Sequence, residues 1–527
     1  MAKVLVSDPI AREGIEVLEK AATVDVKTGL KPEELIEIIG EYDALAVRSE
    51  TKVTAAILDA AKNLKIIGRA GVGVDNIDVA KATELGILVV NSPEGNTVAA
   101  AELTVAMLLA LSRNIPQADS ALRHGEWKRS KYTGVEVYNK VLGVIGLGKI
   151  GREVARRLRA FEMRVIAYDP YANAELAAQL GFELVDLPTL YRTADYITLH
   201  VPKTKETLGM IGATELASMK KGVRLVNVAR GGLIDESALA EALKSGPVAG
   251  AAIDVYSTEP APADNPLLGL PNVVHTPHLG ASTEEAQINV AVDIAEQIVD
   301  VLGGKPARAA VNMPAVDADL LRRIQPFLVL SEKIGSLQGQ LSQQNPSKVE
   351  VIYNGLSEDI PTKHLTRAVL KGLLEVSVPE SVNYVNSPGL AERRGIKLTE
   401  SHRPAAENHS CQLTVRVTGD SGEVRDVCGI VYAGDEARIV HIDGYRVNIE
   451  PHGAMLVTEH IDKPGIIGQV GTLLGNKGVN IGGMHVGREG MGKAALMVLK
   501  IDEPVTDDIL KQIVTIDGME SAKQVQL

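Results

Sequence analysis

The chain has 527 residues, which is too long for one hydrophobic core and predicts three or four domains. Its 55 lysines and arginines face 67 acidic residues, and the net charge of −12 argues against general nucleic-acid binding. Aromatic residues make up only 3% of the chain. The cores must therefore be built from Val, Ile, Leu and Ala, as in parallel α/β sheets.

Three features bear on where the protein works. The most apolar stretch, Thr104 to Ser112, is roughly half as long as a membrane helix, so no membrane span is expected. Cys411 and Cys428 fit neither a metal-binding spacing nor a disulfide framework. The N-terminus lacks a basic-then-apolar leader. We therefore expect a cytoplasmic protein.

Two series of strand-like runs with helical stretches between them predict two doubly wound parallel sheets. The first series runs from Lys3 to Val90 and predicts a flavodoxin-like domain. A helical stretch from Thr97 to about Arg123 leads into the second series. The segment from Thr283 to Leu302 has helical spacing and ends in two glycines, so it is expected to return to the first domain. The expected domains are residues 1–96 with 283–304, and an inserted domain of residues 97–282.

The remainder of the chain predicts two smaller domains. After Pro306 the pattern becomes irregular, and an alternating run then predicts a hairpin that turns at Asp420 to Gly422. We expect an α+β domain of residues 305–451, an intervening domain between the two parallel-sheet domains and the C-terminal domain. From Gly453 the order strand, helix, strand, strand, helix, strand predicts a ferredoxin-like domain of residues 452–527.

A glycine-rich hexapeptide, Gly146-Leu147-Gly148-Lys149-Ile150-Gly151, follows an apolar strand and opens a helix. Glycines at this turn let the backbone approach a pyrophosphate at the helix N-terminus. Asp169 follows the next strand, where a carboxylate accepts both ribose hydroxyls and repels a 2′-phosphate. The pattern favours NAD over NADP. The alternative is a turn whose glycines serve only close packing.

Three motifs lie where strands of the second sheet should end, at residues 227–232, 254–260 and 276–280. Ligands bind at the carboxyl ends of strands in this kind of fold. Oxidation of a secondary alcohol needs a base for the hydroxyl proton, and His278 suits that role near neutral pH. Glu259 can orient the imidazole, and Arg230 can grip a substrate carboxylate through two hydrogen bonds. Separately, each side chain has an ordinary structural explanation, and His275 within a strand run is expected to be structural.

In this order after the glycine-rich loop, the motifs resemble the D-2-hydroxyacid dehydrogenase family over about residues 3–313. The resemblance implies that Arg230 orients the substrate, Glu259 supports the base and His278 transfers the proton. It also implies that Asp254 contacts the nicotinamide carboxamide. The cofactor-binding residues expected from motif and resemblance are Gly146, Gly148, Lys149, Ile150, Gly151, Asp169, Val228, Ala229, Asp254 and Gly280.

Two strands of the first domain end in arginine, Arg48 and Arg69, where loops should face the inter-domain cleft. Two guanidinium groups there suit a phosphate, and family members that act on a phosphorylated hydroxy acid resemble the sequence at both positions. Arg129 and Lys131 add charge near the same cleft or near that of a partner subunit. Solvated surface charge is the alternative for all four residues.

The C-terminal domain resembles an ACT domain, a small-molecule sensor found on enzymes of amino-acid biosynthesis, through His460 to Gly465 and Gly478 to Ile481. A Pro-Gly turn at a helix start exposes N–H groups to a carboxylate. Asp462 and Asn480 can bind the ammonium and polar groups, and His460 can close the site. The alternative is a module used only for dimer contacts. Basic residues of the intervening domain, for which an anion site is a hypothesis, are Lys363, Arg367, Arg393 and Arg394.

The resemblance implies oxidation of 3-phospho-D-glycerate to 3-phosphohydroxypyruvate with NAD, and L-serine as a feedback ligand of the ACT domain. Terminal sensor modules of this kind usually pair, so a homodimer or homotetramer is expected. One alternative is a dehydrogenase of another D-2-hydroxy acid, such as 2-hydroxyglutarate or glycerate. A second alternative is a non-catalytic NAD-binding sensor, although the full set of Arg230, Glu259 and His278 argues against it.

Overall fold

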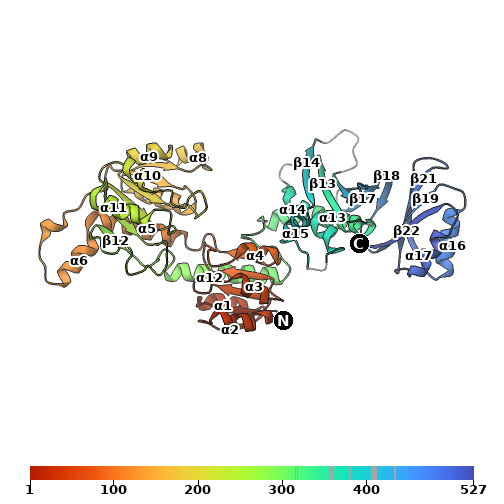
Figure 1. The fold of residues 1–527 in the computed structure, drawn as a ribbon, viewed down its shortest axis with the longest axis horizontal. Coiled ribbons are helices and arrows are strands. Elements are labelled where there is room, and N and C mark those ends of the chain that lie inside the picture. The colour runs from red at the N-terminus through yellow and green to blue at the C-terminus, as the bar shows by residue number, and fades with distance from the viewer. Residues whose placement is uncertain are drawn as a thin grey trace.

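The structure is a computed structural model that describes residues 1–314, 316, 318–342, 344–356, 360–378, 381–404, 412–432 and 435–527. It contains four β-sheets, each with its own helices (Figure 1). The first two sheets are entirely parallel, and the third and fourth are mainly antiparallel. The expected architecture of two doubly wound domains, an α+β domain and a ferredoxin-like domain is confirmed.

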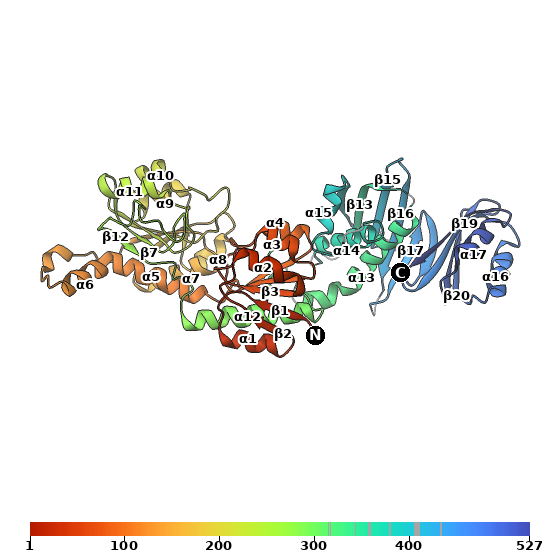
Figure 2. The same cartoon turned by 60° about the horizontal axis from the view of Figure 1, so that its bottom comes forward.

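The first sheet has the strand order β2-β1-β3-β4-β5, which is the flavodoxin-like order. Its strands are β1 (Lys3–Val6), β2 (Thr23–Val26), β3 (Ala44–Val47), β4 (Ile66–Arg69) and β5 (Leu88–Asn91). Its helices are α1 (Arg12–Glu19), α2 (Pro32–Ile38), η1 (Ile39–Glu41), α3 (Ala55–Ala60) and α4 (Val79–Glu84). Helix α12 (Glu284–Leu302) returns to this sheet beside α1 (Figure 2), and its buried Ile294 and Ile298 pack against Val4 and Ile66.

The second sheet has the order β12-β11-β10-β9-β6-β7-β8, a Rossmann sheet with an added seventh strand. Its strands are β6 (Val141–Ile145), β7 (Arg164–Tyr168), β8 (Glu183–Leu184), β9 (Tyr196–Leu199), β10 (Val223–Asn227), β11 (Val248–Ile253) and β12 (Val273–His275). Its helices are α5 (Thr97–Arg113), α6 (Ile115–Arg123), η2 (Arg129–Tyr132), α7 (Lys149–Ala160), α8 (Ala174–Gln179), α9 (Leu187–Thr193), α10 (Ala213–Ser218) and α11 (Glu236–Ser245).

The helical stretch expected from Thr97 to about Arg123 is confirmed, but it is divided into two helices, α5 and α6. The chain bends by 64° between α5 and α6. Asn114 sits between them in the left-handed conformation with φ 53°, and Pro116 falls in the first turn of α6. Asparagine tolerates this conformation, and proline is favoured where a helix starts, so the break is local chemistry that an apolar pattern does not reveal.

The third sheet has the order β14-β13-β15-β16-β17-β18. Its elements are α13 (Ala318–Leu341), β13 (Pro346–Asn354), α14 (Thr362–Glu375), α15 (Ser387–Arg393), β14 (Lys397–Arg403), β15 (Leu413–Gly419), β16 (Val424–Val431), β17 (Ala437–Ile442) and β18 (Tyr445–Ile449). The predicted hairpin is confirmed as β15 and β16. The irregular pattern expected after Pro306 is wrong over α13, whose buried Leu330, Ile334 and Leu337 follow helical spacing despite Pro326 inside the helix.

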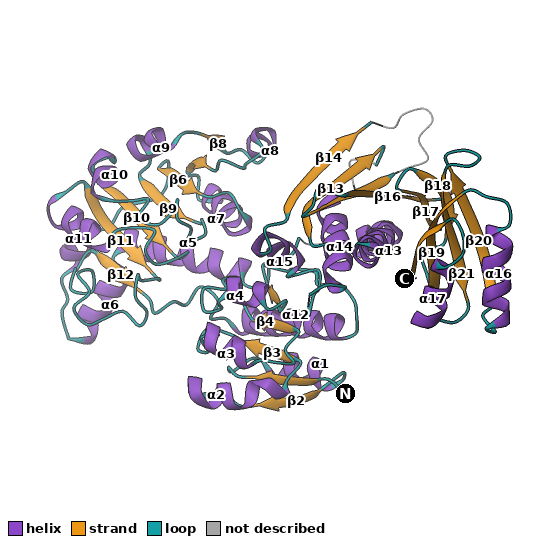
Figure 3. Cartoon of the chain, turned by 45° about the vertical axis from the view of Figure 1, so that its right-hand side comes forward, coloured by secondary structure: helices purple, strands orange, loops and turns teal. Residues whose placement is uncertain are grey.

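The fourth sheet has the order β20-β21-β19-β22 and forms the ferredoxin-like domain. Its elements are β19 (Ala454–Ile461), α16 (Ile466–Asn476), β20 (Ile481–Arg488), β21 (Ala494–Ile501), α17 (Asp507–Val514) and β22 (Met519–Gln526). One face carries Leu456 and packs on α16 and α17. The other carries Val457 and Leu496 and shares one hydrophobic core with the intervening domain. Strand β18 lies beside β20 at this joint (Figure 3).

The intervening domain also contacts the first domain. Val385 is 7% exposed and belongs to the core of the first sheet. The amide Nδ2 of Asn383 donates to the carbonyl oxygen of Gly86 at 2.9 Å. The intervening domain is thus joined to the first domain by an apolar side chain and an amide hydrogen bond.

The structure bears on two expectations from the sequence, one about membrane spans and one about disulfide bonds. Within the described residues no single helix is long and apolar enough to cross a membrane, and only the bent pair of α5 and α6 passes by length and composition. Cys428 is disulfide-bonded, so the expectation that the cysteines form no disulfide is wrong for Cys428. Cys411 lies outside the described residues.

Candidate active site between the two parallel sheets

A hydrogen-bonded pair of acid and imidazole lies at the carboxyl end of the second sheet. The Nδ1 of His278 is 2.7 Å from Oε2 of Glu259. The backbone N–H of Tyr256 donates to Oε1 of Glu259 at 3.0 Å. Burial acts to raise the pKa of Glu259, but the hydrogen bonds from His278 and Tyr256, with the charges of His278 and Arg230, together lower it. Glu259 therefore holds the imidazole as a carboxylate.

The loop that carries His278 is organised by Asp254, which is fully buried. Its carboxylate accepts hydrogen bonds from the hydroxyl of Thr276 (2.6 Å) and the amides of Leu279 (2.7 Å) and Gly280 (3.1 Å). His278 itself has φ 56°, a left-handed conformation that non-glycine residues adopt only when surrounding contacts hold it. Asp254 supplies those contacts, and its role at the nicotinamide stays a prediction.

Arg230 follows β10 on a turn fixed by the buried side chain of Asn227. The amide of Asn227 donates to the carbonyl oxygen of Arg230 at 2.9 Å and accepts from the N–H of Ala229 at 3.1 Å. One guanidinium nitrogen, Nε, lies 3.2 Å from Oδ2 of Asp75 in the first domain. The arginine therefore reaches across the cleft between the two sheets.

The first domain contributes Arg48 and Arg69, as the strand ends predicted. Burial, with the charges of Arg230 and Arg48, lowers the pKa of Arg69 to about 10. Its Nε is buried and has no hydrogen-bond partner among the described residues. Three guanidinium groups thus converge from three strand ends, and a ligand with several negative charges would relieve both their repulsion and the unmet donor.

Two glycines make room for these guanidinium groups. A β-carbon added at Gly71, which has φ 142°, would lie 1.7 Å from Nη1 of Arg69. A β-carbon added at Gly73 would lie 2.1 Å from Nη2 of Arg230. The loop after β4 therefore needs glycine at both positions to let the guanidinium groups pass.

The glycine-rich loop has the geometry that a dinucleotide needs. Gly146 has φ 96°, and a β-carbon added at Gly151 would lie 2.0 Å from the carbonyl oxygen of Gly146. A β-carbon at Gly148 would meet nothing within 4 Å, so the space above this turn is open. Helix α7 begins at Lys149, and Asp169 accepts hydrogen bonds from the amides of Leu147 (2.8 Å) and Tyr171 (2.9 Å). The turn, the helix start and the acid therefore fit NAD.

Sequence reasoning missed several residues of this region. Asp8 is 1% exposed and accepts hydrogen bonds from the amides of Arg48 (2.6 Å) and Thr51 (3.0 Å). Asn76 donates to the carbonyl oxygens of the same two residues. Glu94 forms an ion pair with Lys149 at 2.5 Å. Asp8 could have been identified from the sequence, because it is an acidic residue just after a predicted strand. Nothing in the sequence indicated that Glu94 is the partner of Lys149.

The structure does not bring the expected effector residues together in one chain. His460 and Asp462 lie at the end of β19, where Ile461 pairs with Ala494. Asn480 precedes β20, whose first residue, Ile481, pairs with Ile501 at the other end of β21. The separation is about 20 Å along the strands. His460 is 2% exposed, and Asp462 forms an ion pair with Arg488 at 3.0 Å.

The other predicted basic residues are scattered. Arg129 and Lys131 are exposed in η2, just after α6, which projects from the second domain (Figure 2). In the intervening domain, Arg367 donates to the carbonyl oxygens of Tyr384 (2.9 Å) and Val385 (3.3 Å), which gives it a structural role. Lys363, Arg393 and Arg394 stay predictions.

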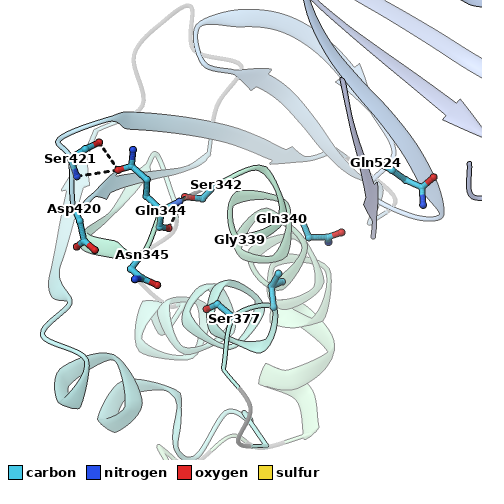
Figure 4. A pocket seen from close by; sticks show the side chains of 10 residues that line it. Gly339, Gln340, Ser342, Gln344, Asn345, Ser377, Asp420, Ser421 and Gln524 are labelled. Atoms are coloured by element: carbon cyan, nitrogen blue, oxygen red, sulfur yellow. Dashed lines mark hydrogen bonds between the residues drawn. The ribbon is translucent and has the colours of Figure 1, made fainter. Parts of the chain in front are cut away.

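Figure 4 shows a cavity of about 720 Å³ at the ends of α13 and α14. The described residues that line it are Gly339, Gln340, Ser342, Gln344, Asn345, Val376, Ser377, Asp420, Ser421 and Gln524. Asp420 is the charged side chain among them, so these residues offer an anion no cation. The cavity belongs to a different domain from the acid and imidazole pair and plays no part in that site.

The fold and the site together define an NAD-dependent dehydrogenase of the D-2-hydroxy acid class. A model of the NAD-binding domain of D-isomer specific 2-hydroxyacid dehydrogenases matches residues 105–280. Models of the D-3-phosphoglycerate dehydrogenase intervening domain and of the ACT domain match residues 323–443 and 454–518. The expected enzyme class, NAD-binding domain and ACT domain are therefore confirmed.

Whole-chain comparisons define the family within this class. The D-3-phosphoglycerate dehydrogenase of Synechocystis sp. is 48% identical over 100% of this chain and 95% of that protein. Those of Archaeoglobus fulgidus and Bacillus subtilis are 48% and 41% identical over 100% of both chains. The chain belongs to the D-3-phosphoglycerate dehydrogenase family.

Solved structures resemble part of the chain. A protein from Thermus thermophilus is 35% identical, with a TM-score of 0.55, over 59% of this chain and 99% of that chain. A D-lactate dehydrogenase from Aquifex aeolicus, complexed with NAD and lactic acid, is 28% identical, with a TM-score of 0.52, over 57% and 96%. The likeness therefore covers almost all of each solved structure but less than two thirds of this chain.

Proposed function

We propose that the protein oxidises 3-phospho-D-glycerate to 3-phosphohydroxypyruvate with NAD, the first step of L-serine synthesis. The observation that carries the proposal is the convergence of Arg48, Arg69 and Arg230, with Arg69 buried and its Nε without a described partner. A substrate that bears both a phosphate and a carboxylate matches this charge. The names of the full-length relatives support the same substrate.

The residues divide the reaction between them. Arg230 binds the substrate carboxylate, while Arg48 and Arg69 bind the phosphate. His278 accepts the proton of the C2 hydroxyl on Nε2, because Nδ1 is engaged by Glu259 at 2.7 Å. Glu259 stabilises the imidazolium that forms. NAD held at the glycine-rich loop would supply the acceptor for the C2 hydride, so that loss of this hydride and of one proton to His278 would turn the alcohol into a ketone.

The phosphate assignment is tested by a steady-state substrate panel with NAD. We expect phosphoglycerate to be turned over far better than glycerate or 2-hydroxyglutarate, and Arg69→Ala to remove most of that preference. Arg69→Lys should keep part of it, because one cation remains. Equal turnover of phosphoglycerate and glycerate by the wild type would end the phosphate argument and favour another D-2-hydroxy acid.

Catalysis itself is tested by absorbance of the reduced nicotinamide. Wild type should produce the signal and His278→Ala should lose it, because no other described imidazole hydrogen-bonds to Glu259. A silent wild type that still binds NADH would favour the non-catalytic sensor instead. The cofactor residues expected at the glycine-rich loop are tested by NADH titration of Asp169→Ala, which should bind more weakly.

We further propose that L-serine binds between two copies of the ACT domain. Strand β20 is the edge of its sheet, and a twofold copy can pair with it antiparallel. That pairing would carry Asn480 of one copy to the Arg488 end of the other, where Asp462 lies. Serine would then take ligands from two chains. Calorimetry tests this with serine, glycine and threonine, and Asn480→Ala and Asp462→Ala should each abolish the serine heat.

The proposal requires at least a homodimer. Helix α6 has no buried residue, and Ile115, Leu122 and Trp127 are 53%, 56% and 77% exposed along the same arm. Exposed apolar side chains on a projecting helix and the loop after it suit contact with a second copy of the chain. Sedimentation equilibrium should give a dimer or tetramer, and Trp127→Glu should shift it toward smaller species. We also propose the domain boundaries stated from the sequence.

A further inference from the structure

Two cations of the NAD-binding domain are paired with carboxylates of the first domain. Nε of Arg230 lies 3.2 Å from Oδ2 of Asp75, in the loop after β4. Nζ of Lys149 lies 2.5 Å from Oε1 of Glu94, in the loop after β5. Each pair joins the two parallel-sheet domains, and each cation lies at a position that the proposed function gives to an anionic ligand.

The Arg230 pair occupies the side of the guanidinium that faces the first domain. Nη1 donates to the carbonyl oxygen of Ala229 at 2.8 Å, and Nη2 packs over Gly73. A substrate carboxylate that binds through two parallel hydrogen bonds needs a free edge of the guanidinium. Asp75 stands at Nε, so the substrate must displace it or accept a poorer geometry.

The Lys149 pair is arranged in the same way. Lys149 is the first residue of α7, where the helix N-terminus favours negative charge. The hydrogen bond from Lys149, followed by its charge, lowers the pKa of Glu94. The carboxylate therefore stays charged at the place where a pyrophosphate would approach the loop.

Both acids remain well solvated. The side chain of Asp75 is 66% exposed and that of Glu94 is 75% exposed. Exposed ion pairs contribute little to folding stability, so a ligand can break either pair without dismantling the fold.

We propose that Asp75 competes with the substrate carboxylate for Arg230, and that Glu94 competes with the cofactor pyrophosphate for Lys149. Each acid keeps its cation oriented and partly neutralised until the ligand replaces it. The inference rests on the proposed function, because it takes Arg230 and Lys149 as the ligand-binding cations. Asp75 and Glu94 are positioning residues that set affinity.

The substrate arm is tested with Asp75→Asn in the full-length protein. Removal of the competing charge should lower KM for phosphoglycerate by about two- to fivefold, with a smaller change in kcat. Asp75→Ser is the second variant, and thermal melts confirm that both fold. The matched control is Asp59→Asn, because Asp59 has similar exposure (60%) and pairs with Lys81 at 3.0 Å within the first domain. A KM that rises or stays constant in both variants would overturn the competition.

The cofactor arm is tested by direct binding. Glu94→Gln should lower the Kd of NADH, measured by the fluorescence of the bound dinucleotide, by about two- to fivefold. The control is Glu41→Gln, because Glu41 is 69% exposed and pairs with Lys3 at 3.1 Å. Asp75→Asn should leave the NADH Kd unchanged. Weaker or equal binding in Glu94→Gln would show that the acid does not compete with the cofactor.

Failure of this inference can be told from failure of the proposed function. Arg230→Gln should raise KM for phosphoglycerate, and Lys149→Gln should raise the Kd of NADH. If they do, while the variants of Asp75 and Glu94 bind no more tightly, only the competition is wrong. If Arg230→Gln leaves KM unchanged, the proposed role of Arg230 fails first.

Discussion

The Nδ1 of His278 is joined to Oε2 of Glu259 at 2.7 Å, and the same carboxylate accepts the amide of Tyr256 through its other oxygen. Two hydrogen bonds therefore fix the acid, and the acid fixes the ring. The backbone of His278 is in turn held in a left-handed conformation, because its N–H donates to the carbonyl oxygen of Asp254 at 2.8 Å. The imidazole is thus positioned before any substrate arrives.

Loss of this imidazole should abolish turnover. His278→Ala is expected to lower kcat by about 100- to 10,000-fold, the usual contribution of a general base. NADH should still bind, because the glycine-rich loop is untouched. His452→Ala is the control, since His452 is 62% exposed in a different domain. Turnover in His278→Ala within tenfold of wild type would contradict the assignment.

Glu259 should show its lowered pKa in the pH dependence of stability. A carboxyl whose folded pKa is lowered stabilises the fold above its ordinary pKa, and this contribution disappears as the pH falls through the lowered value. The melting temperature of the wild type should therefore exceed that of Glu259→Gln above a pH of about 5. The difference between the two melting temperatures should disappear at more acidic pH. Thermal melts of both proteins at several pH values measure it. A gap that widens toward acid would contradict the direction of the shift.

Gly73→Ala should displace the side chain of Arg230 and should hardly change the free energy of unfolding. An added β-carbon would lie 2.1 Å from Nη2 of Arg230, the end of a flexible side chain, so the guanidinium must move. Displacement of a binding group on this scale should lower kcat/KM by about 10- to 100-fold. Gly269→Ala is the control, because a β-carbon there meets nothing within 4 Å. Equal kinetics of the two variants would show that Arg230 tolerates the shift.

The shared core predicts that the intervening and ACT domains unfold together. Leu496 is fully buried in a cluster that contains Leu330 and Val415 from the intervening domain. Leu496→Ala should lower the free energy of unfolding by about 2–5 kcal/mol. In calorimetry, this half of the chain should show a single transition, and its midpoint temperature should fall in the variant. The control Ile467→Ala should lower the free energy of unfolding much less, because Ile467 is 47% exposed. Separate transitions, of which only one moves, would mean that the two domains fold independently.

The domain types and the chemistry of the site could be predicted because they depend on local pattern. Strand and helix periodicity gave the parallel sheets, and the glycine-rich loop followed by Asp169 gave the dinucleotide site. Arg48, Arg69, Arg230, Glu259 and His278 were predicted as site residues because strand ends are where such sheets bind ligands. Helix α13 was missed because Pro326 interrupts its pattern, and the break at Asn114 was missed because asparagine gave no helix-end signal strong enough to outweigh the apolar run.

By itself, the sequence determined which residues have the right chemistry, since side-chain type and distance from a strand end are properties of the chain. Only the tertiary structure decided which of them meet. It placed Asp75 on Arg230 and Glu94 on Lys149, across a gap between two domains, and it separated Asn480 from Asp462 along one sheet. The physical reason is that these residues lie on different strands or domains. The distances between them depend on how the sheets pack and on the register of their strands, and no local sequence pattern encodes either.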